Sequence, residues 1–260
     1  MRYLILLIFS FATCNCYSQK SYSNSKSLFQ DTTIENEHYK IDVSKIVVKD
    51  NGVKLNLKIF NKTSHYLVIK AHEISFSCKS KTFVHKGRNI VINPNEEEIE
   101  VIYFKASNLQ SNSFLLSIDN IYKASAEGQI IRVPTFNLPP TKNEFAIGNF
   151  SCTVLKSETK QKNTSVKFKC QYNGDDIGII NSNKCIAVMA NGEEKPNMKK
   201  QRALVLEQNQ SGTFVATFSN NATSNLEKTI PINWNETFRL SKLVAVDSVK
   251  IDIVKKSSKK

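Results

Sequence analysis

Histidine, cysteine and acidic side chains are the residues through which this chain could perform catalysis or bind a metal. The histidines are dispersed over the first half of the sequence, at His38, His65, His72 and His85. They show no His-x-x-x-His spacing, and no Cys-x-x-Cys pair is present, so the pattern gives no support for a zinc site. The chain also lacks a Gly-x-Ser-x-Gly motif and a glycine-rich phosphate loop. We therefore expect no catalytic residue, no metal ligand and no cofactor.

Two clusters of acidic residues are the remaining candidates for chemistry. One is the run from Glu96 to Glu98 together with Glu100, and the other is the pair Asp175 and Asp176. Paired carboxylates can hydrolyse a glycosidic bond or bind calcium. The glutamate run lies at the start of a predicted strand, where a solvated strand edge explains it, and the aspartates lie in a turn-like sequence. If either pair of carboxylates were instead catalytic, the protein would be a hydrolase of extracellular polymers, and this is the alternative interpretation.

Two cysteines and one tryptophan are candidates whose roles depend on where strands place them. Cys152 and Cys170 lie on neighbouring predicted strands, about equally far from a polar turn near Gln161, so a hairpin would bring them together. They form a disulfide in one interpretation and are two buried free thiols in the other. Trp234 is the only tryptophan. It could stack on a sugar ring if exposed, or cap the end of a β-domain if half-buried.

The start of the chain matches a secretory signal peptide. Arg2 precedes an apolar run, Leu4 to Phe11, that is shorter than the roughly 20 residues a membrane-spanning helix needs. Small side chains at Cys16 and Ser18 predict cleavage between Ser18 and Gln19. We expect an exported protein, periplasmic or secreted. Export into an oxidising compartment permits the disulfide.

A lipid anchor is the alternative to a free exported protein. Cys14 or Cys16 would carry the lipid. Neither has the usual aliphatic residue three positions before it and a small residue directly before it. No later stretch is long and apolar enough to span a bilayer.

The formal net charge of +13 favours an anionic partner. A solvated lysine-rich surface explains most of this charge, because lysines alternate with apolar residues along the predicted strands. Only the tail at 255–260 is a compact basic cluster, and no arginine-rich stripe typical of nucleic-acid binding is present. We expect an unknown envelope protein or an anionic polysaccharide as the partner, and no nucleic acid.

Alternation of apolar and polar residues predicts strands along nearly the whole mature chain. It is strictest over Val53–Ile59, which follows the hairpin signal Asn51-Gly52. A double proline at 139 and 140 reads as a linker. The predicted layout is a signal peptide (1–18), a flexible leader (19–35), a first β-sandwich (36–138), a linker (139–144), a second β-sandwich (145–254) and a basic tail (255–260).

The same order of alternating strands and turns occurs in both halves of the chain, and this order resembles that of a known class of β-modules. Leu55–Asn61 is an alternating strand that ends in asparagine, and Asn93–Ile99 is a proline-marked turn that leads into another strand. Phe168–Asn173 and Gly212–Phe218 repeat this more loosely, without the proline. Each half thus resembles the immunoglobulin-like sandwich modules of exported bacterial proteins. The resemblance implies an all-β fold of two tandem immunoglobulin-like β-sandwiches. It also implies a non-catalytic binding, adhesion or accessory module, or a spacer, at the cell envelope.

Overall fold

The computed structural model describes residues 29–49, 51–106, 109, 111–189, 191–220 and 229–256. Over these residues the regular elements are β-strands, apart from two short 3-10 turns, η1 (Ala71–Glu73) and η2 (Ser182–Lys184). The strands form several antiparallel sheets, so the predicted all-β class is confirmed. The expected cleavage site at Ser18 and Gln19 lies outside the described residues. None of the described helices has the length and apolar character that a membrane crossing requires.

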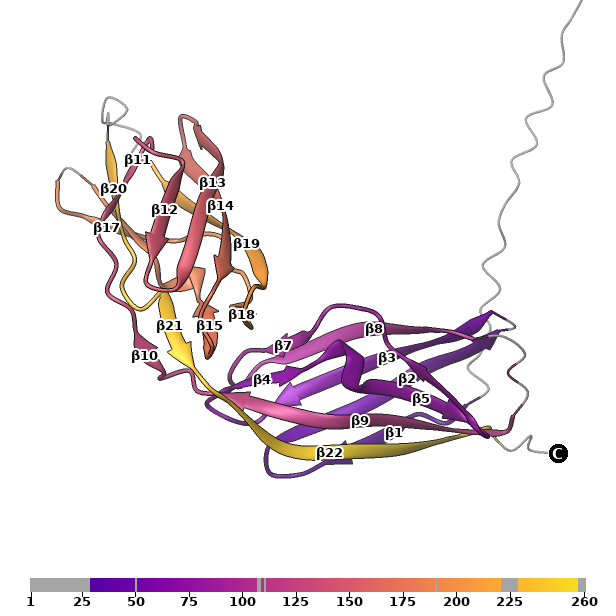
Figure 1. The fold of residues 1–260 in the computed structure, drawn as a ribbon. Helices are drawn as coiled ribbons and strands as arrows, with labels where there is room; N and C mark the ends of the chain where they lie inside the picture. Colours follow the sequence, from indigo (N-terminus) through magenta and orange to yellow (C-terminus); the bar gives the residue numbers. More distant parts are fainter. Residues whose placement is uncertain are drawn as a thin grey trace, which may run out of the picture.

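The first hydrophobic core lies between two sheets (Figure 1). One sheet has the order β1-β2-β3-β8, and the other has the order β6-β5-β9-β4-β7 with β22 paired to β9. The strands are β1 (Thr32–Glu35), β2 (Tyr39–Lys49), β3 (Gly52–Asn61), β4 (Tyr66–Ile69), β5 (Ile74–Cys78), β6 (Lys81–Val84), β7 (Ile90–Ile92), β8 (Glu97–Lys105), β9 (Ser113–Ala124) and β22 (Leu243–Val254).

The strand β3 shows how the sequence pattern builds this core. Its apolar residues, every second position from Val53 to Ile59, are buried, while the alternate side chains face away from the core. Because side chains alternate between the two faces of a strand, one face of β3 packs inward along its whole length. The register pair Lys49↔Gly52 closes the tight turn that Asn51-Gly52 predicts.

The second hydrophobic core lies among three four-stranded sheets, with orders β12-β13-β14-β19, β11-β20-β16-β17 and β10-β21-β15-β18. Their strands are β10 (Gln129–Ile130), β11 (Phe136–Leu138), β12 (Glu144–Ile147), β13 (Phe150–Thr159), β14 (Asn163–Tyr172), β15 (Ile177–Ile180), β16 (Ile186–Val188), β17 (Glu194–Pro196), β18 (Leu204–Leu206), β19 (Ser211–Ser219), β20 (Ile230–Asn233) and β21 (Phe238–Ser241). The order β12-β13-β14-β19 repeats the order β1-β2-β3-β8 of the first core. The fully buried strands β4 and β15 are likewise each followed by a 3-10 turn.

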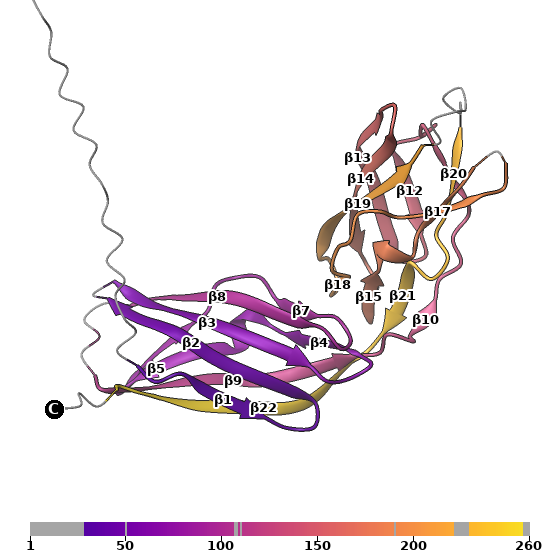
Figure 2. The ribbon, with the colours of Figure 1, turned by 180° about the vertical axis from the view of Figure 1, so that it is seen from behind.

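The last strand, β22, belongs to the first core and not to the second. We expected the strand ending at Val254 to lie with residues 145–254, but β22 pairs with β9 along its length, and both views show the two strands side by side (Figures 1 and 2). Its buried residues Val249, Ile251 and Ile253 join the first core. The second core is thus inserted between β9 and β22, and the chain passes between the two cores twice.

Two further boundaries differ from the sequence prediction. Thr32–Glu35 lies within the expected flexible leader but forms β1, because β2 offers it a complete antiparallel partner. The double-proline segment lies between β11 and β12 inside the second core, where Leu138 and Ile147 flank it, and does not connect the two cores. A double proline also suits a turn between strands, and that is its role here.

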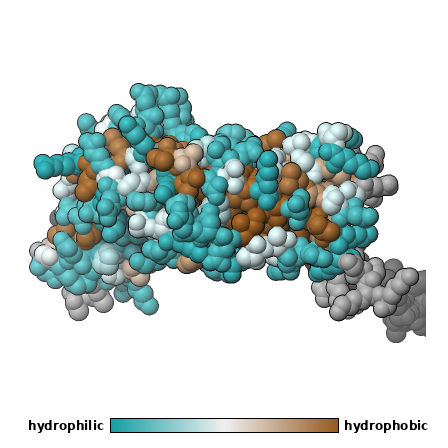
Figure 3. All heavy atoms as spheres, turned by 90° about the horizontal axis from the view of Figure 1, so that it is seen from below, coloured by the Kyte–Doolittle hydropathy of each residue, from teal (hydrophilic) through white to brown (hydrophobic). Residues whose placement is uncertain are grey.

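The surface of the first core carries apolar area. Viewed from below, the largest brown region lies over the part of the molecule that holds β1 and β22, and polar atoms surround it (Figure 3). On the outer face of the β1-β2-β3-β8 sheet, the alternate residues Ile99, Val101 and Tyr103 of β8 are 53%, 52% and 41% exposed. The outward side of this edge strand is therefore unusually apolar.

Candidate functional site

The residues with catalytic potential do not converge. Among the described residues, no group of three or more His, Cys, Asp or Glu side chains lies close enough to hold a metal ion. His38 lies 3.2 Å from the carboxylate of Glu37, and the ring of His85 packs against Phe104 with 6.1 Å between the centroids. These two histidines thus have separate local contacts and share no cluster of ligands in the described part of the chain.

The acidic run at the start of β8 is tied to the second core. Glu98 is 9% exposed and is paired with Arg202, which lies just before β18. Arg202 also lies 3.3 Å from Glu100, and Arg88 lies 3.1 Å from the same carboxylate. The expected solvated strand edge is therefore wrong for Glu98. Arg202 balances its charge from a position 104 residues away in the sequence.

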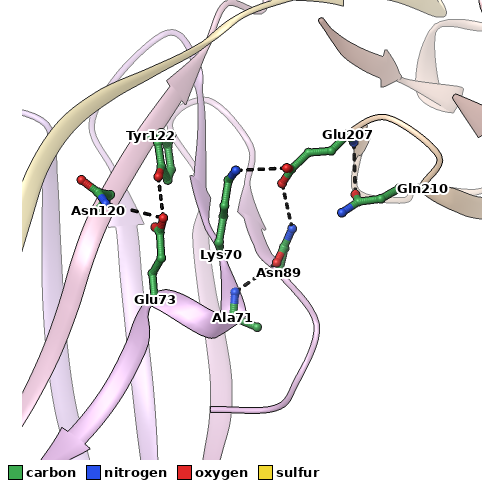
Figure 4. Close-up of polar contacts among 8 residues, drawn as sticks. All are labelled: Lys70, Ala71, Glu73, Asn89, Asn120, Tyr122, Glu207 and Gln210. Atoms are coloured by element: carbon green, nitrogen blue, oxygen red, sulfur yellow. Dashed lines mark hydrogen bonds and ion pairs between the residues drawn. The ribbon is translucent and has the colours of Figure 1, made fainter. Parts of the chain in front are cut away.

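A second polar contact between the two cores centres on Glu207 (Figure 4). The ammonium of Lys70 lies 3.0 Å from Glu207 Oε2, and Asn89 Nδ2 donates to Oε1 at 3.5 Å. Asn89 is positioned in turn because its Oδ1 accepts from the backbone N–H of Ala71 at 3.0 Å. The backbone N–H of Glu207 donates to Gln210 Oε1 at 3.1 Å. Two residues of the first core therefore hold the Glu207 carboxylate, while Gln210 of the second core holds its backbone.

Glu73 lies beside this contact and is also engaged. The Tyr122 hydroxyl donates to Glu73 Oε1 at 2.5 Å, and this hydrogen bond, followed by burial, raises the pKa of Tyr122 to about 12. Lys70 lies 5.1 Å from the centroid of the Tyr122 ring, within the range of a cation–π contact. Glu73 Oε1 is thus held within the first core, whereas its Oε2 is buried without a hydrogen-bond partner among the described residues. The pair of Lys70 with Glu207 is the contact that braces the two cores against each other here.

An apolar cluster completes the contact between the cores, which we call the junction. Tyr66 and Ala124 of the first core pack with Ile177, Ile179 and Ala203 of the second. Asn181 Nδ2 also donates to the Tyr66 hydroxyl at 3.2 Å. Apolar burial and balanced ion pairs thus both hold the junction.

One groove lies at the junction. The junction groove has a volume of about 510 Å³, and the edge strand β18 contributes part of its wall. Its lining residues are Gly87, Arg88, Asn89, Val91, Arg202, Ala203, Leu204, Val205, Leu206, Gln210, Ser211 and Gly212. Its two arginines are the ones paired with Glu98 and Glu100, so their charge is already balanced.

A second groove lies on the side of the first core, between β6 and β8. The side groove has a volume of about 760 Å³. Its lining residues are Thr82, Phe83, Val84, His85, Lys86, Gly87, Tyr103 and Lys105. β6 is the last strand of one sheet and β8 the last strand of the other, so the groove follows the gap between two sheet edges. It combines cations with rings and contains no carboxylate, and we take it as the candidate functional site.

Cys152 and Cys170 are register partners on β13 and β14, with Cα atoms 4.1 Å apart and their sulfur atoms bonded. The other two cysteines of the described chain, Cys78 and Cys185, are buried and free. Burial raises the pKa of the Cys185 thiol to about 12, so it is unreactive at neutral pH.

Trp234 is 2% exposed and lies in the second core. Rings surround it: Phe136, Phe145, Phe168, Phe214 and Phe238 all have centroids within 6.4 Å of it. Stacking on a sugar needs an exposed ring face, so the interpretation of Trp234 as a ligand contact is wrong. The chain around it places the indole inward, where aromatic packing stabilises the core.

Comparison with known proteins adds no family. No family model and no curated protein matches the chain. Among solved structures, a conserved domain protein from Bacillus anthracis aligns over 89% of this chain and 93% of its own length, with 9% identity and a TM-score of 0.23. A beta-porphyranase of glycoside hydrolase family 86 from Bacteroides plebeius aligns over 88% of this chain at 12% identity, with a TM-score of 0.19. This chain spans 38% of that protein. Similarities this weak carry no argument about function.

The side groove has no signature in the sequence. Its lysines and rings come from β6, the segment after it and β8, which belong to different sheets. A local pattern shows which face of a strand is outward but not which other strand lies across the gap. The sequence predicts only that Tyr103 lies on the outward face of β8, because apolar and polar positions alternate along that strand.

Proposed function

We propose that this chain is an exported, non-catalytic module that binds, adheres to or assists a partner at the cell envelope. The secretory signal in the sequence supports export. The side groove carries the binding part of the proposal. It is an open recess on a β-scaffold in which lysines that form no ion pair with any described residue lie beside the exposed ring of Tyr103. Edge strands and end loops of such scaffolds commonly supply contact surfaces.

The acidic residues support binding over hydrolysis. A glycosidase needs two carboxyl groups on either side of the scissile bond, one of them free to act as an acid. Glu98 and Glu100 are instead paired with Arg202, and Glu207 with Lys70. These carboxylates are engaged in ion pairs at the junction and do not face each other across an open cleft.

We also propose the finer fold: two immunoglobulin-like β-sandwiches in one chain, the second inserted into the first. Two separate cores and the repeated order β1-β2-β3-β8 and β12-β13-β14-β19 support this proposal. The insertion between β9 and β22 replaces the simple tandem boundary at 139–144. A braced junction would hold the two sandwiches in one orientation and so present the side groove in a fixed direction.

Cosedimentation of the purified mature protein with a native envelope preparation tests the function. We expect saturable binding, with no release of reducing sugar or peptide from the preparation. Release of soluble fragments that scales with protein concentration, without saturable binding, would overturn the proposal in favour of the hydrolase.

A further inference from the structure

We propose that the side groove binds an acidic polysaccharide, with lysines that contact carboxylate or sulfate groups and a tyrosine that stacks on a sugar ring. This inference rests on the proposed binding function and names its ligand class. It follows from three observations: the uncompensated charge of the groove, its exposed ring and the origin of its two walls.

The charge of the groove is uncompensated. Lys86 and Lys105 are exposed, line the groove and form no ion pair with any residue in the described part of the chain. No carboxylate belongs to the lining. The junction groove differs in this respect, because its arginines are paired with glutamates. An anion that enters the side groove therefore meets two cations without displacing an internal partner.

The ring of Tyr103 is exposed and held in place. It is 41% exposed, and its hydroxyl donates to the backbone carbonyl of Asn51 at 3.1 Å. A ring fixed by its hydroxyl keeps its faces available at little cost in side-chain entropy, which suits stacking on the apolar face of a sugar. Phe83 and His85 add further ring surface to the groove.

The origin of the walls favours a polysaccharide over an added peptide strand. Strand addition continues one sheet through backbone hydrogen bonds along a free edge. Here one wall comes from β6 and the segment after it, and the other from side chains of β8 in the opposite sheet. An occupant lies between two sheet edges and meets mainly side chains. β6 itself has four residues, a short template for a strand.

Calorimetric titration with defined probes tests the ligand class. The probes are oligogalacturonate for carboxylate, dextran sulfate for sulfate, and maltooligosaccharide as the neutral control. We expect the mature protein to bind at least one acidic probe, with affinity that falls as salt is raised, and not to bind the neutral one. Anionic lipid vesicles serve as a separate probe for a headgroup source of the same charge.

Charge-matched variants locate the binding. The double variant K86E/K105E should lower affinity for the acidic probe about tenfold or more, since it reverses both cations. K167E/K169E changes the net charge equally on exposed lysines of β14 in the second core and should stay within about twofold. Y103A should weaken binding while Y103F retains most of it, because the ring and not the hydroxyl contacts the sugar. If K86E/K105E does not fold, the comparison of Y103A with Y103F still tests whether the probe binds in the side groove.

The outcomes separate this inference from the broader function. Equal losses in the two charge variants, equal binding of the neutral probe, or vesicle binding without polysaccharide binding each overturn the inference. If the wild type cosediments with envelope but binds neither acidic probe, the ligand class is wrong and the binding function survives. If it binds neither envelope nor probes, both proposals fall.

Discussion

The hydroxyl of Tyr39 donates a hydrogen bond to Asp247 Oδ2 over 2.8 Å, and so connects the second strand of the chain to the last one. Asn36 Nδ2 donates to the same oxygen at 3.0 Å. The hydrogen bond from Tyr39 is the largest cause that lowers the pKa of Asp247. These contacts help to hold β22 in the first core, although the whole second core lies between β22 and the other strands of the first core in the sequence.

Removing this hydroxyl should weaken the first core. Tyr39→Phe should lower the free energy of unfolding by about 1 kcal/mol, because it deletes a hydrogen bond to a charged group while the buried ring remains. Urea denaturation measures the change. Tyr103→Phe is the matched control, since its hydroxyl contacts an exposed carbonyl, and it should change stability by less than about 0.5 kcal/mol. Equal effects of the two variants would contradict the role given to Tyr39.

The same contact predicts a pH dependence. A carboxylate whose pKa is lowered by folding contributes stability above its unfolded pKa of about 3.9, and this contribution is lost as pH falls through the folded value. The wild type should therefore lose stability below about pH 4 more steeply than Asp247→Asn, which cannot titrate. Chemical denaturation from pH 5 to pH 2 checks this. Parallel curves would show that Asp247 has the same pKa in both states.

The pairing of Glu98 with Arg202 should be worth more than an exposed ion pair. Arg202→Ala should destabilise the protein by about 1–3 kcal/mol because it leaves a nearly buried carboxylate without its partner. Adding Glu98→Gln should recover part of the loss. Lys156→Ala breaks an exposed pair with Glu158 and should cost less than about 1 kcal/mol. A double-mutant cycle gives the coupling energy, and a value near zero would contradict a structural role at the junction.

The disulfide predicts a thiol count and a stability change. In denaturant without reductant, alkylation and intact mass should show that Cys152 and Cys170 are protected while Cys78 and Cys185 react. Replacing both bonded cysteines by serine should lower stability by about 3 kcal/mol, because the bond joins residues 18 apart in sequence and so restricts the unfolded chain. Four reactive thiols in the unreduced mature protein would contradict the bond.

Burial of Trp234 predicts its fluorescence. The emission maximum of the native protein should lie at short wavelength, resist quenching by acrylamide and shift to longer wavelength on unfolding. Trp234→Ala should cost about 3–5 kcal/mol, because it opens a cavity among five phenylalanine rings. An emission maximum typical of water-exposed tryptophan in the native protein would contradict this position.

Local pattern was enough to predict part of this fold, and the reasons lie in particular residues. The strict alternation of Val53–Ile59 and the Asn51-Gly52 turn predict β3 and its hairpin with β2, because both depend on near neighbours in sequence. The placement of Cys152 opposite Cys170 follows in the same way from a hairpin of nearly equal arms.

Contacts between distant segments were beyond the sequence pattern. Alternation in β22 specifies a half-buried strand but not that β9 is its partner, so its place in the first core was missed. The local pattern predicts that Glu98 is solvated, because its partner Arg202 is distant in sequence and meets it only at the junction of the folded chain. The side groove was missed for the same reason, since Lys86 and Tyr103 come together only when two sheets pack.

The insertion of the second core has a mechanical consequence. Phe29 and Lys255 form an antiparallel bridge, so the two ends of the described chain leave the first core at the same pole. A pulling force applied at these ends would act first on β22 at Val254. It would break the register pairs between β22 and β9 one after another, starting from that end, and would not break them all at once by shear. The second core, which is inserted between β9 and β22, would carry no load until β22 had detached. Under tension, the first core would therefore unfold before the disulfide-bonded second core does.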